Sequence, residues 1–273
     1  MKRKSILMFL MLGAALAAAA EIPGKLYRNR MVGLDYYYNH ELLAEPNSQP
    51  VQYHYTWEDE RASGFSGLAA IIRGLGARVT AVGKPEPAML ERLSIYIIVD
   101  PDTPKETAAP HYLMAAEIAV IADWVKKGGV LVLMANDSAN CEFTHFNRLA
   151  ERFAIHFNAD LRNPVLNNDF SMARFKNLPH HPLFVGVDQI YVKELCTLAI
   201  QPPAQAVLKD GPHTIMAFAP YGQGKVFAIG DPWLYNEYLD GYKLPAEYEN
   251  TKAANNLFLW LLGLAQDPLV SNR

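Results

Sequence analysis

The sequence of 273 residues is short of cysteine and of charge, and both shortages exclude classes of protein. Its two cysteines, Cys141 and Cys196, form no Cys-x-x-Cys unit, which argues against a disulfide scaffold and a cysteine-based zinc site. Charged residues make up 19% of the chain, and the formal net charge of -3 provides no basic stripe for nucleic acid. Hydrophobic residues, at 51%, are too abundant for a disordered chain. The composition also excludes a coiled coil, a collagen and a membrane bundle.

The N-terminal segment has the pattern of a secretory signal peptide. Basic residues at positions 2–4 precede an apolar stretch at 6–20 that ends in a run of alanines, including Ala18-Ala19-Ala20. This stretch is shorter than the roughly 20 residues of a usual membrane-spanning helix, and its small-residue end suits signal peptidase. We predict that residues 1–20 are removed and that the rest is periplasmic or secreted, with no integral membrane segment. The alternative is a retained N-terminal anchor. After export, Cys141 and Cys196 could pair or remain buried thiols.

Buried strands alternate with amphipathic helices over most of the chain. Apolar runs predict strands at 31–35, 77–82, 94–100 and 130–135, and apolar spacing predicts helices at 62–75, 115–127 and 246–264. Short strands with turn signals between them follow from about residue 189 to residue 229. The pattern predicts a single α/β domain over residues 21–273. Its sheet is expected to be mainly parallel and doubly wound, with an antiparallel C-terminal extension.

Polar residues follow four of the predicted strands at the point where each ends. They are Asp35, Asp100, the pair Asn136-Asp137, and Asp231. Open α/β sheets bind ligands outside the carboxyl ends of their strands, so these residues could position a substrate or a metal. Each could instead cap a turn or a helix. An antiparallel last strand would remove Asp231 from the group.

Aromatic and polar residues are concentrated in three patches, at 35–41, 53–59 and 231–238. These patches hold seven of the 14 tyrosines. Aromatic faces flanked by carboxylates, asparagine and histidine suit sugar rings, since the C–H face stacks on an aromatic ring while the hydroxyls need polar partners. The alternative is that they are surface loops whose tyrosine rings seal the edge of the core. The candidate substrate-binding residues are Asp35, Tyr37, His40, Glu41, His54, Trp57, Trp233, Tyr235, Asn236 and Glu237.

The loop at 136–147 leaves a predicted strand and enters a predicted helix, but it lacks the Gly-x-Ser-x-Gly frame of a nucleophile elbow. Glu142 and His145 are three residues apart and can share a helical face. That spacing would serve a general acid–base pair, or two ligands of a divalent metal. The alternative is a helix start capped by Thr144 or Asn140. No Walker or dinucleotide fingerprint is present, so no other cofactor is predicted.

Four blocks of the sequence, at 96–106, 128–137, 142–147 and 230–238, resemble a known family. It is the glutamine-amidotransferase-like domain found beside, or fused to, unsaturated rhamnogalacturonyl hydrolases of pectin-degrading bacteria. The resemblance covers residues 31–264 and implies a class I amidotransferase-type, flavodoxin-like fold. It also implies a role in the breakdown of plant cell-wall saccharides, with a separate unsaturated-uronyl glycosidase as a partner. The Cys-His-Glu arrangement of true glutamine amidotransferases is absent, which argues against amide hydrolysis.

Two functional hypotheses follow. The first is an exported carbohydrate-active hydrolase that acts on a pectin-type oligosaccharide, with Glu142 and His145 as acid–base catalysts and Asp137 and Asp231 completing the catalytic set. The second is a non-catalytic module that binds a glycan or docks a partner beside a separate glycosidase. Convergence of Glu142, His145, Asp231 and His40 in one pocket would favour catalysis. Scattered positions with an open aromatic groove would favour binding.

Overall fold

The computed structural model of the protein describes residues 26–44, 49–239 and 243–268. The predicted signal peptide, residues 1–20, lies outside these ranges. Within them, no helix has the length and apolar character needed to cross a membrane.

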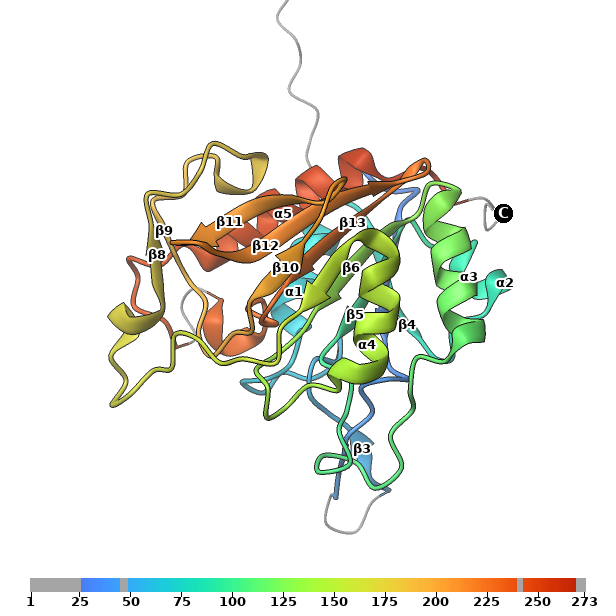
Figure 1. Ribbon diagram of the computed structural model, residues 1–273, viewed down its shortest axis with the longest axis horizontal. Coiled ribbons are helices and arrows are strands. Elements are labelled where there is room, and N and C mark those ends of the chain that lie inside the picture. Colours follow the sequence, from blue (N-terminus) through green and yellow to red (C-terminus); the bar gives the residue numbers. More distant parts are fainter. Residues whose placement is uncertain (1–25, 45–48, 240–242, 269–273) are drawn as a thin grey trace, which may run out of the picture.

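A nine-stranded mixed sheet forms the centre of the protein (Figure 1). Five neighbouring strands are parallel, and antiparallel strands extend the sheet beyond them. The order across the sheet is β4 (Arg78–Val82), β1 (Met31–Asp35), β5 (Ile95–Val99), β6 (Val130–Met134), β13 (Gly224–Ile229), β12 (His213–Tyr221), β10 (Leu198–Ile200) and β7 (Ile155–Phe157), with β11 (Gln205–Asp210) also paired to β12. The predicted α/β class and the largely parallel sheet are therefore confirmed.

Helices cover both faces of this sheet (Figure 1). On one face, α1 (Ser66–Gly74) and α5 (Asn250–Leu264) pack into one core cluster, whereas α3 (Ala115–Lys126) and α4 (Phe143–Ala150) pack into a second cluster on the other face, next to the short α2 (Pro87–Leu90). Strand β5 shows why its sequence is apolar throughout. Ile97 faces the first cluster and Ile98 faces the second, so no residue of this strand meets water.

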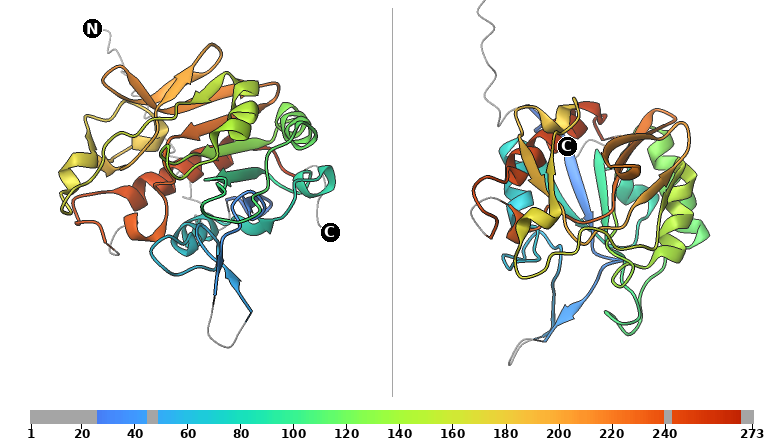
Figure 2. Two further views of the ribbon diagram at one scale, coloured as in Figure 1. Left: turned by 60° about the horizontal axis from the view of Figure 1, so that its bottom comes forward. Right: turned by 60° about the vertical axis from the view of Figure 1, so that its left-hand side comes forward.

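Smaller elements decorate the sheet. The pairs β2 (Leu42–Leu43) with β3 (Val51–Gln52), and β8 (Arg174–Lys176) with β9 (Gln189–Tyr191), form two separate hairpin-like sheets. Strands β2 and β3 project away from the body of the domain (Figure 2). Single 3-10 turns lie at η2 (Glu151–Phe153), η3 (Phe170–Ala173), η4 (Pro182–Phe184) and η5 (Asn236–Tyr238).

The structure differs from the sequence-based expectation at two places. The helix expected from residue 62 begins at Ser66, because Gly64 makes a turn in which an added Cβ would lie 1.8 Å from the carbonyl oxygen of Asp59. The last strand, β13, is parallel to β6 and sits inside the sheet rather than in an antiparallel extension. Of the two alternatives left open for the cysteines, the structure has the second, because Cys141 and Cys196 are both free and buried.

The exposed margin of the sheet at β7 is closed by a side chain. Asn147, on α4, accepts a hydrogen bond from the Phe157 backbone N–H at 2.8 Å and donates one to the Phe157 carbonyl at 3.0 Å. Its amide thus takes the place of a neighbouring strand. An unpaired strand edge invites pairing with another chain, so this contact protects the fold as well as stabilising it.

We expect Asn147→Ala to lower the free energy of unfolding by about 1–3 kcal/mol, because two buried backbone groups lose their partner. Urea unfolding monitored by circular dichroism measures the change. Thr144→Ala, at an exposed position of the same helix, is the matched control and should change stability by less than about 0.5 kcal/mol. Equal stability of the two variants would contradict this role of Asn147.

Candidate functional site

The four strand-end polar positions lie along one edge of the sheet. Strands β1, β5, β6 and β13 are parallel, so Asp35, Asp100, Asp137 and Asp231 all follow carboxyl ends of strands at the same edge. The expectation that they share an edge is confirmed, and the parallel direction of β13 keeps Asp231 in the group.

The direction of strand addition reverses between β1 and β5. The chain passes from β1 through α1 to β4 on one side, and from β5 through α3 to β6 on the other, with the two helices on opposite faces. Loops that leave two such strands diverge and leave a crevice between them, which is where open α/β sheets bind ligands. The loops at residues 35–41 and 100–106 flank this switch point.

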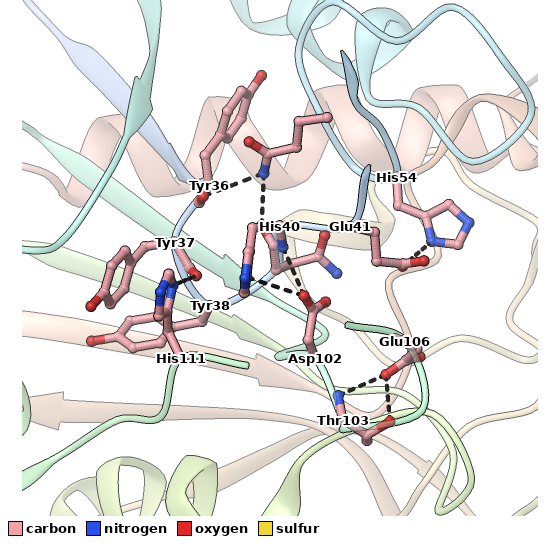
Figure 3. Close-up of polar contacts among 12 residues, drawn as sticks. Tyr36, Tyr37, Tyr38, His40, Glu41, His54, Asp102, Thr103, Glu106 and His111 are labelled. Carbon is pink, nitrogen blue, oxygen red and sulfur yellow. Dashed lines mark hydrogen bonds and ion pairs between the residues drawn. The ribbon is translucent and has the colours of Figure 1, made fainter. Parts of the chain in front are cut away.

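These two loops satisfy each other's polar groups (Figure 3). The Asn39 side chain donates to the carbonyl of Asp100 at 2.8 Å, and the backbone N–H of Asp102 donates to the carbonyl of Tyr38 at 2.9 Å. In the other direction, the backbone N–H of His40 donates to Asp102 Oδ2 at 3.0 Å. The crevice is therefore built on hydrogen bonds rather than on apolar packing alone.

Burial changes the acidity of the carboxyl groups at this edge. It raises the pKa of Asp35 to about 7, even though Asp35 accepts hydrogen bonds from the Tyr96 hydroxyl at 2.7 Å and the Tyr38 N–H at 2.7 Å. Burial likewise raises the pKa of Asp102 to about 7, with Glu41 and Glu106 adding to the effect. These two groups gain protons near neutrality, as groups at functional sites often do.

A stack of three rings joins the two loops (Figure 3). The His111 ring lies 4.0 Å from the Tyr37 ring and 4.4 Å from the His40 ring, close to parallel with both. His111 Nδ1 is 2.8 Å from the Tyr37 carbonyl, and because a carbonyl only accepts, Nδ1 must carry the proton. His40 Nδ1 is 3.2 Å from Asp102 Oδ2 but out of line for a hydrogen bond. Burial and the neighbouring His111 lower the pKa of His40.

Three residues of the loops around the switch point have a left-handed backbone conformation. His54 and Tyr55 have φ values of 57° and 45°, and Asp100 has a φ of 43°. Such left-handed conformations cost about 1–3 kcal/mol each outside glycine, and they cluster at functional sites. Contacts hold the strained residues in place: His54 Nδ1 donates to Glu41 Oε1 at 2.6 Å, and the Tyr55 hydroxyl donates to Asp100 Oδ2 at 3.1 Å.

An open hollow of about 640 Å³ lies next to these residues. It is lined by Tyr36, Val51, Gln52, Thr56, Glu58, Asp59, Glu60 and Arg61. Gln52 connects the hollow to the switch point, since its side-chain amide donates to the carbonyl of Asn39 at 2.8 Å. The first two aromatic patches of the sequence therefore meet in one place.

The two residues of the predicted acid–base pair, Glu142 and His145, contact each other. Glu142 caps α4, accepting the His145 backbone N–H at 2.9 Å, and its other oxygen lies 3.1 Å from His145 Nδ1. The alternative of a capped helix start is therefore right about the cap, but the capping residue is Glu142 rather than Thr144 or Asn140. Asp137 likewise closes its own turn, with its oxygens accepting from the Ala139 N–H and the Asn140 side chain.

The third aromatic patch is largely buried. Trp233 of this patch is fully buried, and Trp57 of the second patch is 3% exposed, so neither can stack on a sugar in this conformation and the expectation for these two residues is wrong. The side chain of Asn236 holds a neighbouring loop in place: it accepts a hydrogen bond from the Gly67 N–H and donates to the carbonyls of Asp59 and Arg61.

The other predicted residues of this patch also serve local contacts. Tyr235 packs its ring 4.5 Å from that of Tyr238, and Glu237 pairs with Lys243 at 2.8 Å. Asp231 is 1% exposed, and its burial raises its pKa well above the usual range. None of these residues lines the hollow.

No group of three or more potential metal ligands occurs within residues 26–44, 49–239 and 243–268. The two-ligand pair Glu142 and His145 gains no third ligand there.

A protein-family model matches residues 58–243, which is more than half of the sequence. The chain belongs to the DUF4350 family, a domain of unknown function. No curated protein matches it. Among solved structures, the N-terminal domain of mmIFT52 is similar to the DUF4350 chain over 85% of this chain and 96% of its own, at 19% identity and a TM-score of 0.63. The cytoplasmic protein STM1381 from Salmonella typhimurium LT2 covers 85% and 99%, at 12% identity and a TM-score of 0.55.

These matches correct the resemblance drawn from the sequence. The matched family is one of unknown function, and neither it nor these structural neighbours shows an association with glutamine amidotransferases or rhamnogalacturonyl hydrolases, so that assignment is not upheld. The four sequence blocks are strand ends and helix starts that many α/β sheets share. Block 128–137, for instance, is a glycine helix stop followed by buried strand β6.

Sequence reasoning missed three residues of the candidate site, Asp102, Glu106 and His111. They lie in or directly after the proline-rich loop that follows β5. The available signal was a second carboxylate two residues after the strand-end Asp100. Its importance depends on the position of β5 at the switch point, which requires the strand order.

The raised pKa values predict how stability depends on pH. Folded Asp35 and Asp102 hold a proton up to about pH 7, whereas their unfolded values are near 3.8. Their contribution to stability is therefore complete below about pH 3.8 and declines as the pH rises through this window to about 7. Asp35→Asn, which keeps an acceptor for the Tyr38 N–H, should raise the melting temperature at pH 8 and flatten its decline between pH 5 and 8.

Differential scanning calorimetry of both proteins across this range measures the effect. Asp123→Asn, at an exposed position on α3, is the control and should leave the slope unchanged. An Asp35→Asn protein with the wild-type slope would show that Asp35 is ionised in the fold.

Proposed function

We propose that the switch-point crevice and its adjoining hollow bind a hydroxyl-rich ligand of the saccharide class. The observation that carries the proposal is the position of the 640 Å³ hollow, which adjoins the β1/β5 switch point and gathers tyrosine, amide, carboxylate and guanidinium groups. Its volume lies within the range of roughly 300–1,000 Å³ that is usual for small-molecule sites.

The chemistry of the hollow suits a sugar. Sugar hydroxyls need dense donors and acceptors, which Glu58, Gln52 and Arg61 supply. The Tyr53 ring, part-exposed beside the hollow and 5.4 Å from the Arg61 guanidinium carbon, offers an aromatic face. Strained His54 and Tyr55 support the same proposal, since such conformations are retained where the surroundings hold a site in shape.

Binding is favoured over catalysis by the state of the predicted acid–base residues. Glu142 and His145 contact each other at the start of α4, whereas His40 stacks on His111 in the switch-point crevice. The protein is accordingly proposed as an exported, periplasmic or secreted glycan-binding module. We keep a separate glycosidase in this proposal as the class of partner beside which the module would work. The link to pectin rested on the corrected resemblance and is not retained.

Isothermal titration calorimetry of the full chain against a panel of neutral, acidic and aminated oligosaccharides tests the proposal. We expect saturable binding of at least one class, and Tyr53→Ala should weaken it about tenfold by removing the ring beside the hollow. Tyr221→Ala, at the opposite edge of the sheet, should bind as the wild type does. Failure of every saccharide to bind would refute the proposal.

The same mixtures, analysed for cleavage products, separate binding from turnover. We expect the ligand to be recovered intact. Cleavage that Glu142→Gln abolishes would instead support the hydrolase hypothesis.

A further inference from the structure

The hollow beside the switch point carries more negative charge than its own cations balance. Three successive acidic residues, Glu58, Asp59 and Glu60, line it together with a single cation, Arg61. Arg61 is committed to Asp59, whose Oδ1 accepts from its Nε at 2.7 Å and from its backbone N–H at 3.0 Å. Among the described residues, no ion pair joins Glu58 or Glu60 to a cation.

A buried polar atom at this hollow lacks a partner. Asp59 is only 6% exposed, and its Oδ2 has no hydrogen-bond partner in the described part of the chain. Burying a carboxylate oxygen without a partner is unfavourable unless a positive charge lies close by. Arg61 binds only the other oxygen, so Oδ2 is left without a partner in a residue that lines the hollow.

The neighbouring carboxylate is held in position. The Tyr36 hydroxyl donates to Glu58 Oε2 at 2.5 Å and itself accepts from the Trp57 N–H at 2.5 Å. This places Glu58 against the hollow before any ligand arrives, which reduces the entropy lost on binding. Glu60 is exposed on the same rim.

We infer that the ligand of this hollow carries a protonated amine, and that it is therefore an aminated saccharide. The inference rests on the proposed saccharide function and specifies its substrate class. A primary ammonium supplies three donors for Glu58, Glu60 and nearby carbonyls, and it neutralises the unbalanced charge. A divalent metal fits less well, because the described residues contain no cluster of three ligands.

The test compares two oligosaccharides of equal length, one of glucosamine with free amines and one of N-acetylglucosamine without charge. Titration calorimetry of the full chain near neutral pH should show the aminated probe binding at least about tenfold more tightly. The difference should shrink when sodium chloride is raised from about 0.05 to about 0.5 M, because salt screens exposed charges.

Variants locate the interaction. Glu60→Gln removes charge at an exposed position without touching the contacts of Asp59, and it should reduce the preference for the aminated probe while sparing the acetylated one. Glu58→Gln should also reduce the preference for the aminated probe. Glu151→Gln, an exposed carboxylate near the opposite margin of the sheet, is the matched control and should keep the preference.

The outcomes separate this inference from the function beneath it. Equal affinity for the two probes would overturn the amine requirement and leave saccharide binding intact. A preference that survives in the Glu58→Gln, Glu60→Gln double variant would overturn the assignment to this hollow. Absence of binding by both probes and by every other saccharide would refute the proposed function itself.

Discussion

The site depends on one constraint, which is that the loops leaving β1 and β5 diverge and must satisfy each other's backbone groups across the gap. Asn39 and Asp102 meet this requirement, the first with a side-chain donor to a carbonyl and the second with both a donor and an acceptor. Because these bonds are shielded from water, they hold the crevice in a fixed shape. The ring stack of Tyr37, His111 and His40 is built on that frame.

The same constraint explains why carboxyl groups at this edge hold protons near neutrality. Loops that fold over the strand ends bury Asp35 and Asp102 together with the backbone donors that they serve. Hydrogen bonds lower the pKa of each carboxyl group, but burial raises it further than they lower it. The edge is therefore less negative than its number of carboxylates suggests, whereas the exposed Glu58 and Glu60 on the neighbouring rim stay in contact with water.

Much of the central fold could be predicted from the sequence, because buried parallel strands announce themselves as apolar runs such as 95–99. The site was harder to predict, for two physical reasons. Strand order is a long-range property, so nothing local marked the switch point or singled out Asp102. An aromatic residue in the sequence can equally belong to a binding groove or to a core. Trp233 belongs to the core, where it is fully buried in the cluster formed with α1 and α5. Asn236 is likewise of a residue type that often contacts ligands, but its side-chain amide is hydrogen-bonded to the loop at 59–67.

The central place of β13 has a consequence for the order in which the molecule can assemble. Residues 224–229 fill the position between β6 and β12, so the parallel and antiparallel halves of the sheet are not joined until that late segment is available. Contacts between residues so distant in sequence slow folding, because a long loop must close before they form. A nascent chain therefore cannot join the two halves of its sheet until residues 224–229 have left the ribosome.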